Sequence, residues 1–246
     1  MRVGAQKEVT SGSKSVSLLC SKVGTKKLWV EISSKQNYTC DVLGVRTPSS
    51  SSSCQVGDTG PGGGIVFYVA STAFTATGTT CNTNCHYLEA APNTWNGGST
   101  DPMNVWATAY AGCYNEWDAL GGCRSGSIYQ AANGTASRTA ATAIGMGMAN
   151  TTAIVARHVG VDTNTYAAGM ADALTFGGQS DWFLPSKDEL NEMFKNKSSA
   201  GGFATLCYWS SSEVAAILAW YQCFSLGSQI NLNKNGTGLV RPVRAF

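Results

Sequence analysis

The chain has 246 residues, of which only 13% are charged, against about 25% in an ordinary soluble domain. Small polar residues replace much of that charge, with 28 Gly and 26 Ser, while 43% of the residues are hydrophobic. This composition excludes wholesale disorder, and no apolar run approaches the roughly 20 residues that a membrane-spanning helix needs. A net charge of +2 argues against a nucleic-acid-binding protein.

The charge is unevenly distributed along the chain. Residues 1–47 carry eight basic and three acidic side chains, a net +5, and the remainder carries nine basic and twelve acidic, a net −3. We therefore predict a small Cys-paired β module over residues 1–47, a Ser-rich linker over 48–56 and a larger domain over 57–246. The basic residues of the module form either a solvated face or an anion-binding arm.

Cysteine usage points to an oxidising location outside the cytoplasm. Most of the nine cysteines lie close together in sequence, which suits short loop-closing disulfides. The predicted pairs are Cys20–Cys40, Cys81–Cys85, Cys113–Cys123 and Cys207–Cys223. Cys54 is left over, either free or bonded to another molecule. Zinc is the competing explanation, but Cys81 and Cys85 with His86 have no second knuckle after them.

The first half of the larger domain opens with a glycine-rich segment, Gly57–Gly64, followed by an apolar strand, Ile65–Val69. A phosphate-binding loop would follow a strand and open a helix with Gly-Lys-Ser/Thr, so this order excludes that interpretation. A second strand is predicted over Tyr87–Ala90. We see no signal peptide after Met1 and expect the chain to begin inside a larger precursor.

Helices are predicted in the middle and strands at the end. Asn150 could cap a helix through about His158, and a short helix is predicted over Thr165–Leu174. Ser186 and Glu189 form a capping box that opens the clearest helix. The predicted strands after it are Tyr208–Ser210, Ala219–Phe224, Gln229–Asn233 and Leu239–Val243. This order is typical of an α+β domain whose last strands pair with its first.

Motifs for catalysis are weak, and the sequence indicates a protein that is not an enzyme. Neither His86 nor His158 lies near a nucleophile motif, and Ser210–Ser212 fits a strand-to-loop transition as well as a reactive site. No cofactor is predicted. Scattered Asp residues leave a structural calcium ion open, although no loop has EF-hand spacing.

Several ordered strings carry a resemblance to a known family. They are Gly57–Tyr68, Tyr87–Pro92, Gly177–Gly178 leading to Asp181–Leu190, Tyr208–Glu213 and Val240–Phe246. Together they resemble the bacterial Lcl C-terminal-like domain, the C-terminal family of a collagen-like adhesin, over about residues 55–246.

The resemblance implies a C-type-lectin-like fold, akin to the formylglycine-generating-enzyme-like domains, with surface display and ligand binding. In that fold Trp182, Pro185 and Trp209 would build the core, and Arg241 and Arg244 would anchor the last strand. No catalytic residue is carried over. The copper-binding cysteines of the formylglycine-generating enzymes have no matching motif here, which makes that activity the less favoured alternative.

The segment from Glu213 to Arg241 departs from the polar, Asn-rich pattern of such relatives. It resembles the variable proteins of diversity-generating retroelements, in which template adenines, often in Asn codons, are randomised. Randomising the adenines of an Asn codon can produce the amino acids found at nine positions of this segment. These positions form the predicted ligand-binding set: Val214, Ile217, Leu218, Tyr221, Cys223, Leu226, Ile230, Leu232 and Leu239. We expect these side chains to project to solvent above Trp209, Trp220 and Phe224. The alternative is an ordinary strand with one buried face, since Ile230 and Leu232 alternate with asparagines.

The sequence therefore predicts a surface-displayed, non-catalytic ligand-binding protein, adhesin-like or receptor-like, at an extracellular, cell-surface or virion-surface location. Its partner would be a protein or glycan on another cell or surface, with no nucleic acid and no membrane span. The alternative is a structural shell or fibre subunit that uses the same face for self-assembly, so a homo-oligomer stays open.

Overall fold

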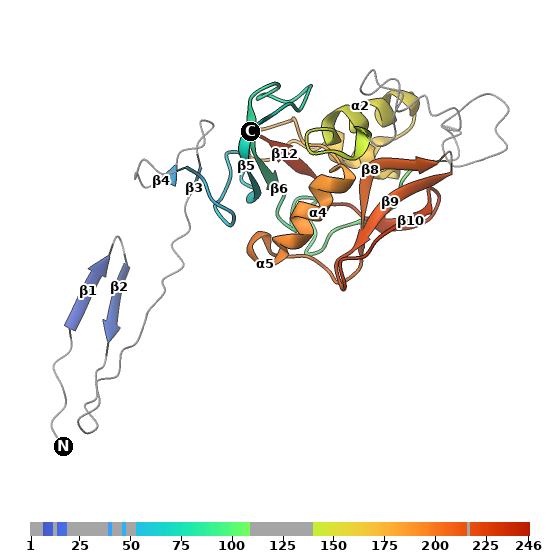
Figure 1. The fold of residues 1–246 in the computed structure, drawn as a ribbon. Coiled ribbons are helices and arrows are strands. Elements are labelled where there is room, and N and C mark those ends of the chain that lie inside the picture. Colours follow the sequence, from blue (N-terminus) through green and yellow to red (C-terminus); the bar gives the residue numbers. More distant parts are fainter. Residues whose placement is uncertain are drawn as a thin grey trace. The chain divides into compact units, whose positions relative to one another are not determined.

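A computed structural model describes residues 7–11, 14–18, 39–40, 46–47, 53–108, 140–215 and 217–246 (Figure 1). The chain divides into two compact units between Gln36 and Asn37. In the first unit, strands β1 (Lys7–Ser11) and β2 (Lys14–Leu18) form an antiparallel hairpin. We had expected the first module to extend to residue 47, but the structure assigns residues from Asn37 onward to the larger unit.

The cysteine that we paired with Cys20 has a different partner. Cys40 lies at the end of β3 (Thr39–Cys40), which pairs with β4 (Arg46–Thr47), and is bonded to Cys54 with a Cα–Cα distance of 5.8 Å. Both cysteines are buried in a small cluster with Val66 and Phe246. The predicted pair Cys20–Cys40 is therefore wrong, and Cys54 is not left over. It also belongs to this core rather than to a free Ser-rich linker.

The other disulfide predictions fall into two groups. Cys81–Cys85 and Cys207–Cys223 are bonded in the structure, as predicted from their closeness in sequence. The predicted pair Cys113–Cys123 lies outside the described residues, as does Cys20.

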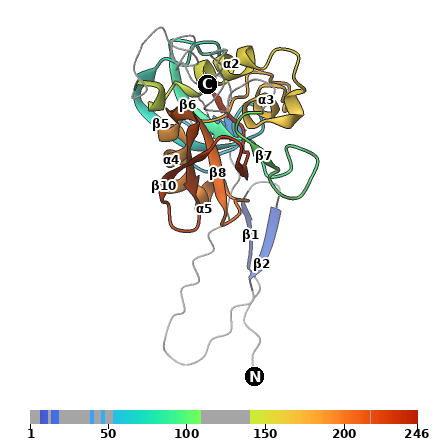
Figure 2. The same ribbon diagram turned by 90° about the vertical axis from the view of Figure 1, so that its right-hand side faces the viewer.

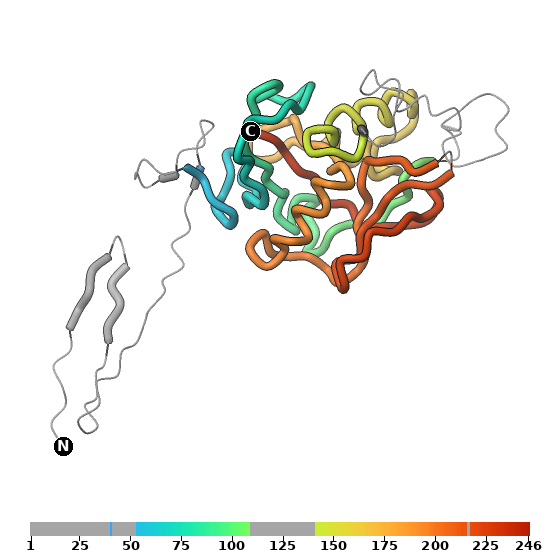
Figure 3. Tube along the Cα trace, in the orientation of Figure 1, coloured from blue at the N-terminus to red at the C-terminus, as the bar shows by residue number. Residues whose placement is uncertain are grey.

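A three-stranded sheet joins the beginning of the larger unit to its end. Its strand order is β12-β6-β5, with β5 at Ile65–Phe74, β6 at Cys85–Ala90 and β12 at Val243–Ala245. Both neighbouring pairs are antiparallel. The chain's end thus runs back beside its first long strands (Figure 3), which confirms the expected pairing of last strands with first. The terminal strand is shorter than predicted, since Val240–Pro242 lies between two strands.

A second, five-stranded sheet has the order β10-β9-β8-β11-β7. Its strands are β7 (Met103–Val105), β8 (Cys207–Ala215), β9 (Leu218–Cys223), β10 (Gln229–Asn233) and β11 (Thr237–Leu239). All neighbouring strands are antiparallel except β11 and β8, which are parallel. Strands β10 and β7 lie at opposite margins of the sheet (Figure 2).

Helix α4 (Lys187–Lys195) contacts strands of both sheets, β5 on one side and β8 and β9 on the other (Figure 1). The predicted capping box is present: the Ser186 hydroxyl accepts from the Glu189 backbone, and the Glu189 carboxylate accepts from the Ser186 N–H at 2.7 Å. The remaining helices among the described residues are η3 (Ala140–Thr142), α2 (Gly147–Arg157), η4 (Thr163–Thr165), α3 (Ala167–Asp172) and α5 (Lys197–Ala200). The described part of the larger unit is therefore a mixed α+β domain.

Asn150 does not cap its helix, because α2 already begins at Gly147. Its side chain is buried and donates to the carbonyl of Ala141 at 2.7 Å and to the Ser211 hydroxyl at 3.3 Å. The Asn150 side chain thus links α2 to β8, and it does not accept from the free backbone N–H groups at the start of the helix.

The glycine-rich segment before β5 wraps around a carboxylate of the same chain. The N–H groups of Gly62 and Gly64 each donate to Glu89 at 2.9 Å. A Cβ at Gly62 would overlap both Glu89 and the Trp182 ring, so the close approach requires glycine. Burial raises the pKa of Glu89, and the nearby Arg244 guanidinium, which bonds to it at 3.1 Å, opposes that shift. The backbone N–H groups of this glycine-rich segment therefore bind the carboxylate of Glu89, where a phosphate-binding loop would bind a phosphate.

The two arginines of the final segment are buried and paired. Arg241 donates to Asp101 through two nitrogens, each at 2.6 Å, and to the carbonyl of Ala91 at 2.9 Å. Arg244 pairs with Glu89 and Asp181. These contacts agree with the anchoring role expected for both arginines. Trp182, Pro185 and Trp209 are buried as expected.

Candidate ligand-binding surface on the β9–β10 hairpin

The β9–β10 hairpin lies in a long segment without exposed charge. Between Lys197 and Arg241 the sequence contains one acidic and one basic residue, Glu213 and Lys234. These two side chains are 1% and 0% exposed and form a buried ion pair with each other. The Lys234 ammonium also lies 4.5 Å from the centre of the Trp106 ring. The surface contributed by residues 198–240 therefore contains no charged side chain.

Strand β9 is held from both of its sides. Cys207 and Cys223 stand directly opposite each other on β8 and β9, and their disulfide joins the strands at a Cα–Cα distance of 3.8 Å. The Ser210 hydroxyl donates to the carbonyl of Trp220 at 2.9 Å. Gln222 is fully buried and donates to Asn191 of α4 at 2.9 Å. Buried residues of the fold thus hold the hairpin in place, and we call these buried residues the frame.

The turn between β9 and β10 is fastened to the helices beneath it. Gly227 has φ +82°, a conformation that favours glycine, and a Cβ there would overlap the Phe194 ring of α4. Its N–H donates to the carbonyl of Cys223 at 2.7 Å. The Lys197 ammonium donates to the carbonyl of Phe224 at 2.6 Å. Leu226, at the tip of this turn, is 85% exposed although its backbone neighbours are anchored.

Alternation along the paired strands separates the hairpin into two faces. Trp220, Gln222 and Gln229 lie on the α4 side, where Gln229 donates to the carbonyl of Lys187 at 3.0 Å. The opposite side carries Tyr221, Cys223, Ile230 and Leu232, with Ile230 opposite Tyr221 in the register. We call these four residues and Leu226 the hairpin face.

The predicted binding residues lie in three places. Five form the hairpin face, where Leu226 and Ile230 are exposed and the other three are half-buried. Tyr221 packs on the Trp209 ring, with centroids 5.3 Å apart. Val214, Ile217 and Leu218 are half-buried at the β8–β9 connection, the other end of the hairpin. The structure therefore groups part of the predicted set and separates the rest.

The prediction that Leu239 projects to solvent as a binding residue is wrong. It is only 3% exposed and packs in a buried cluster with Tyr208 and Val243. Leu239 stands beside Tyr208 in the parallel pairing of β11 with β8, in a strand pair at the centre of the sheet. An aliphatic side chain there is covered from solvent, so Leu239 belongs to the frame.

The expected scaffold beneath the hairpin is partly as predicted. Trp209 and Phe224 are buried, at 0% and 2% exposure. Trp220 is half-buried and lies under the ammonium of Lys187, 4.3 Å from its ring centre. This residue therefore faces α4 and supports the hairpin from the side opposite the hairpin face.

Four exposed apolar residues lie outside the predicted binding set: Val69, Met103, Val159 and Leu206. Leu206 is 53% exposed, and its carbonyl accepts from the N–H of Phe224 at 2.9 Å, beside the Cys207–Cys223 disulfide. Met103, on β7 at the far margin of the sheet, is also 53% exposed. The scarcity of charged residues between Lys197 and Arg241 was the sequence signal that could have drawn attention to Leu206.

The serines after Trp209 are structural. Ser211 and Ser212 are buried, and the hydroxyl of Ser212 donates to the carbonyl of Ala141 at 2.9 Å. Ser210 is committed to the Trp220 carbonyl. None of the three hydroxyls bonds to a histidine or carboxylate that could act as its general base, among the hydrogen bonds of the described residues.

Two buried titratable groups have shifted pKa values that follow from packing. Burial raises the pKa of Glu189 to about 7, against the opposing effect of N–H groups from Ser186, Gly145 and Gly147. Burial lowers the pKa of His158, which stacks on the Tyr166 ring with centroids 3.9 Å apart. Both groups lie inside the fold, so these shifts bear on stability.

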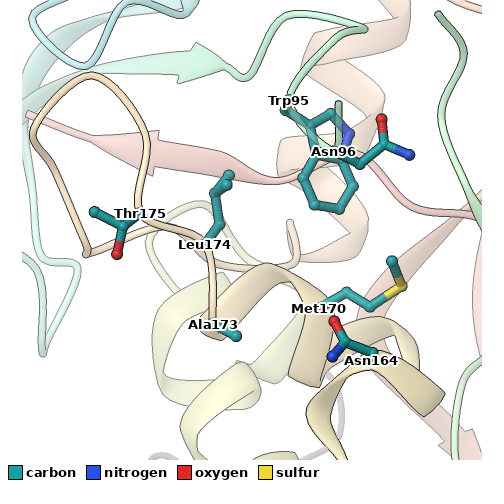
Figure 4. Close-up of a pocket in the computed structure, with 7 residues that line it drawn as sticks. All are labelled: Trp95, Asn96, Asn164, Met170, Ala173, Leu174 and Thr175. Atoms are coloured by element: carbon teal, nitrogen blue, oxygen red, sulfur yellow. The ribbon is translucent and has the colours of Figure 1, made fainter. Parts of the chain in front are cut away.

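A hollow of about 320 Å³ lies away from the hairpin, between the segment after β6 and helix α3 (Figure 4). Its lining residues are Trp95, Asn96, Asn164, Met170, Ala173, Leu174 and Thr175. The Trp95 ring is fixed by its Nε1 donating to Asp101 at 3.0 Å and is only 8% exposed. A lining of this kind contains no charged side chain and suits a small neutral ligand.

Within the described ranges, no cluster of three or more His, Cys, Asp or Glu side chains is arranged to hold a metal ion. The helices among those residues are all too short or too polar to cross a bilayer.

Comparisons with known proteins give little beyond this geometry. No protein-family model matches the chain, and no curated protein matches it. Among solved structures, a fimbrial protein from Bacteroides ovatus is similar at 14% identity with a TM-score of 0.45. That match covers 74% of this chain and 44% of the fimbrial protein, so the chain spans less than half the length of that structure.

Proposed function

We propose that the larger unit is a surface-displayed, non-catalytic ligand-binding domain, adhesin-like or receptor-like, whose binding surface is the hairpin face. The observation that carries this proposal is the combination of exposed aliphatic side chains, Leu226 and Ile230, with the absence of exposed charge over residues 198–240. Exposed apolar groups on a rigid support are a common feature of interaction sites.

The disulfides support display in an oxidising compartment. Cys40–Cys54, Cys81–Cys85 and Cys207–Cys223 are three bonds in one unit, and such bonds persist outside reducing cytoplasm. The C-type-lectin-like fold is part of the same proposal. Its support is the antiparallel sheet that joins the first long strands to the chain's end, together with the helix α4 between two sheets.

Diversification of the binding surface by a retroelement is the finer form of this proposal. It fits a hairpin in which Trp209, Gln222 and Phe224 are buried while Leu226 and Ile230 are exposed. The test is genomic: a second copy of the segment encoding residues 208–246, beside a reverse transcriptase and differing only at adenines, would support it. A second copy that differs equally at all bases would contradict it.

Binding itself is tested with two double variants of the purified chain on arrays of glycans and of purified cell-surface proteins. Leu226→Asp with Ile230→Asp places charge on the hairpin face. Val159→Asp with Met103→Asp is the matched control, because these residues are also exposed and apolar but lie outside that face. We expect wild-type binding to be lost in the first variant and kept in the control. Equal binding by both variants would contradict the proposed site.

A further inference from the structure

The outer margin of the five-stranded sheet is formed by strand β10, and only β9 pairs with it among the described strands. The direction of its backbone groups follows from two hydrogen bonds that flank the strand. Cys223 N–H donates to the Ser228 carbonyl at 3.0 Å, and Lys234 N–H donates to the Ile217 carbonyl at 2.9 Å. Both pairs continue the β10–β9 register at either end.

In an antiparallel ladder, hydrogen-bonded pairs alternate with non-hydrogen-bonded pairs. Because Ser228 and Lys234 belong to hydrogen-bonded pairs, Ile230 and Leu232 do as well, and their backbone groups point toward β9. The backbone N–H and C=O groups of Gln229 and Asn231 and the N–H of Asn233 therefore point away from the sheet, while the Asn233 carbonyl accepts from the Gly236 N–H at 2.8 Å in the turn after β10. This margin presents a row of three residues that can pair with another strand.

The usual protections of an exposed edge are missing from β10. Edge strands are normally blunted by charge, proline or a β-bulge. The sequence Gln229–Asn233 contains neither charge nor proline, and its register with β9 has no shift. Strand β5, at an edge of the other sheet, has register shifts after Val66 and Val69. The contrast marks β10 as an edge that is open to pairing.

The pattern of β10 is self-complementary about Asn231. Polar residues occupy positions 229, 231 and 233, and apolar residues occupy 230 and 232. When two copies run antiparallel with their Asn231 residues opposed, Gln229 faces Asn233 and Ile230 faces Leu232 of the other copy. This register is the one that pairs all five residues and places outward-pointing groups opposite each other, for about four backbone hydrogen bonds that do not use the Asn233 carbonyls.

We infer that β10 pairs with β10 of a second copy of this chain, to give a two-fold symmetric dimer with one continuous sheet. No like charges oppose this pairing, because the strand is uncharged. Ile230 and Leu232 of one copy then pack against Leu232 and Ile230 of the other, and the two hairpin faces lie side by side. An isologous contact of this kind closes on itself and does not propagate into a fibre.

The first test is the mass of the purified chain, measured by sedimentation equilibrium in wild type and in Asn231→Pro. Proline removes the outward N–H at the centre of the edge, while the ladder to β9 uses neighbouring residues. We expect twice the chain mass for wild type and a twofold lower mass for the variant, with an unchanged circular dichroism spectrum. A wild-type monomer at every concentration, or a dimer that persists in a folded variant, would overturn the inference.

A cross-link decides the question independently of how the proline variant folds. Opposed residues of a hydrogen-bonded pair have Cα atoms about 5.5 Å apart, which lies within the range of a disulfide. Asn231→Cys should therefore form a disulfide-linked dimer on non-reducing gels. Asn235→Cys, in the exposed turn after β10, is the matched control and should stay uncross-linked. Equal cross-linking of the two variants would overturn the symmetric register.

Discussion

Both sheets of the larger unit bury their charged residues, and they differ in the contacts that those residues make. Around β12-β6-β5, Glu89 and Arg244 are buried in a network with Asp181 and glycine amides. The β9–β10 hairpin uses its nearest charged pair, Glu213 and Lys234, inside the fold and leaves its surface neutral and partly apolar. The first region thus links its buried charges to the end of the chain, whereas the hairpin leaves Leu226 and Ile230 exposed.

The largest expected loss of stability comes from the frame. Asp101→Ala would leave Arg241 buried without its carboxylate partner and would also remove the acceptors of Tyr208 and Trp95. Breaking one side of a buried ion pair costs about 3–5 kcal/mol, so we expect a loss of that size in the free energy of unfolding by urea. A loss below about 1 kcal/mol, as for a surface pair, would show that Asp101 is not part of the frame.

A smaller loss is expected from the disulfide that joins β8 to β9. Replacing Cys207 and Cys223 by serine opens a loop with a sequence separation of 16, for which loop entropy gives about 3 kcal/mol. The matched control is the Cys81–Cys85 pair, whose separation of 4 corresponds to about 2 kcal/mol. Thermal unfolding of both double variants checks the order. The reverse order would indicate that the hairpin does not depend on its disulfide.

A pH effect is expected from His158. Its pKa is lowered by burial in the folded state, so the unfolded chain takes up a proton first as the pH falls through about 6.5. The stability contributed by neutral His158 is present above that pH and is lost as the pH falls toward the folded-state pKa. His158→Gln should therefore flatten the fall in unfolding free energy below pH 6.5.

The control for this effect is His86→Gln, which replaces the only other histidine of the sequence. Glu189 acts in the opposite sense, because its pKa of about 7 makes stability fall as the pH rises from about 4.5 to 7. It is present in wild type and in both variants, so the difference between their pH profiles isolates the histidine. Identical profiles for wild type and His158→Gln would contradict the prediction.

The smallest effect is expected on the hairpin face. Leu226 is 85% exposed, and substitutions of exposed residues change stability by about 0.5 kcal/mol or less. Leu226→Asn should fall within that range when unfolding is followed in urea. A loss of 2 kcal/mol or more would place Leu226 in the core and remove the distinction between hairpin face and frame.

Local patterns were the part of the fold that the sequence predicted well. The capping box placed the start of α4 because Ser186 and Glu189 contact each other within one turn. Alternation gave the bounds of β10, Gln229–Asn233, because one side of the strand faces the protein. Cys40 was mispaired because its partner Cys54 is brought near by packing against Val66 and Phe246, and closeness along the chain does not report such contacts.

The sequence was also a limited guide to the candidate surface, because it does not show which side chains are covered by packing. Ile230 and Tyr221 could be expected on one face because they occupy matching positions of two paired strands. Leu239 met the same codon criterion but lies on β11, between β8 and β7, where its side chain is covered. A codon pattern says which residues can vary and contains no information on the direction of a side chain, which depends on the register of the sheet.

The measurement that tests the central claim most directly is the folded fraction of two displayed libraries, read by resistance to protease. One library randomises Tyr221, Leu226, Ile230 and Leu232 of the hairpin face, and the other randomises Trp209, Ala219, Gln222 and Phe224 of the frame. If the hairpin face is a binding surface on an independent frame, most clones of the first library stay folded and few of the second do. Equal folded fractions in the two libraries would contradict the account.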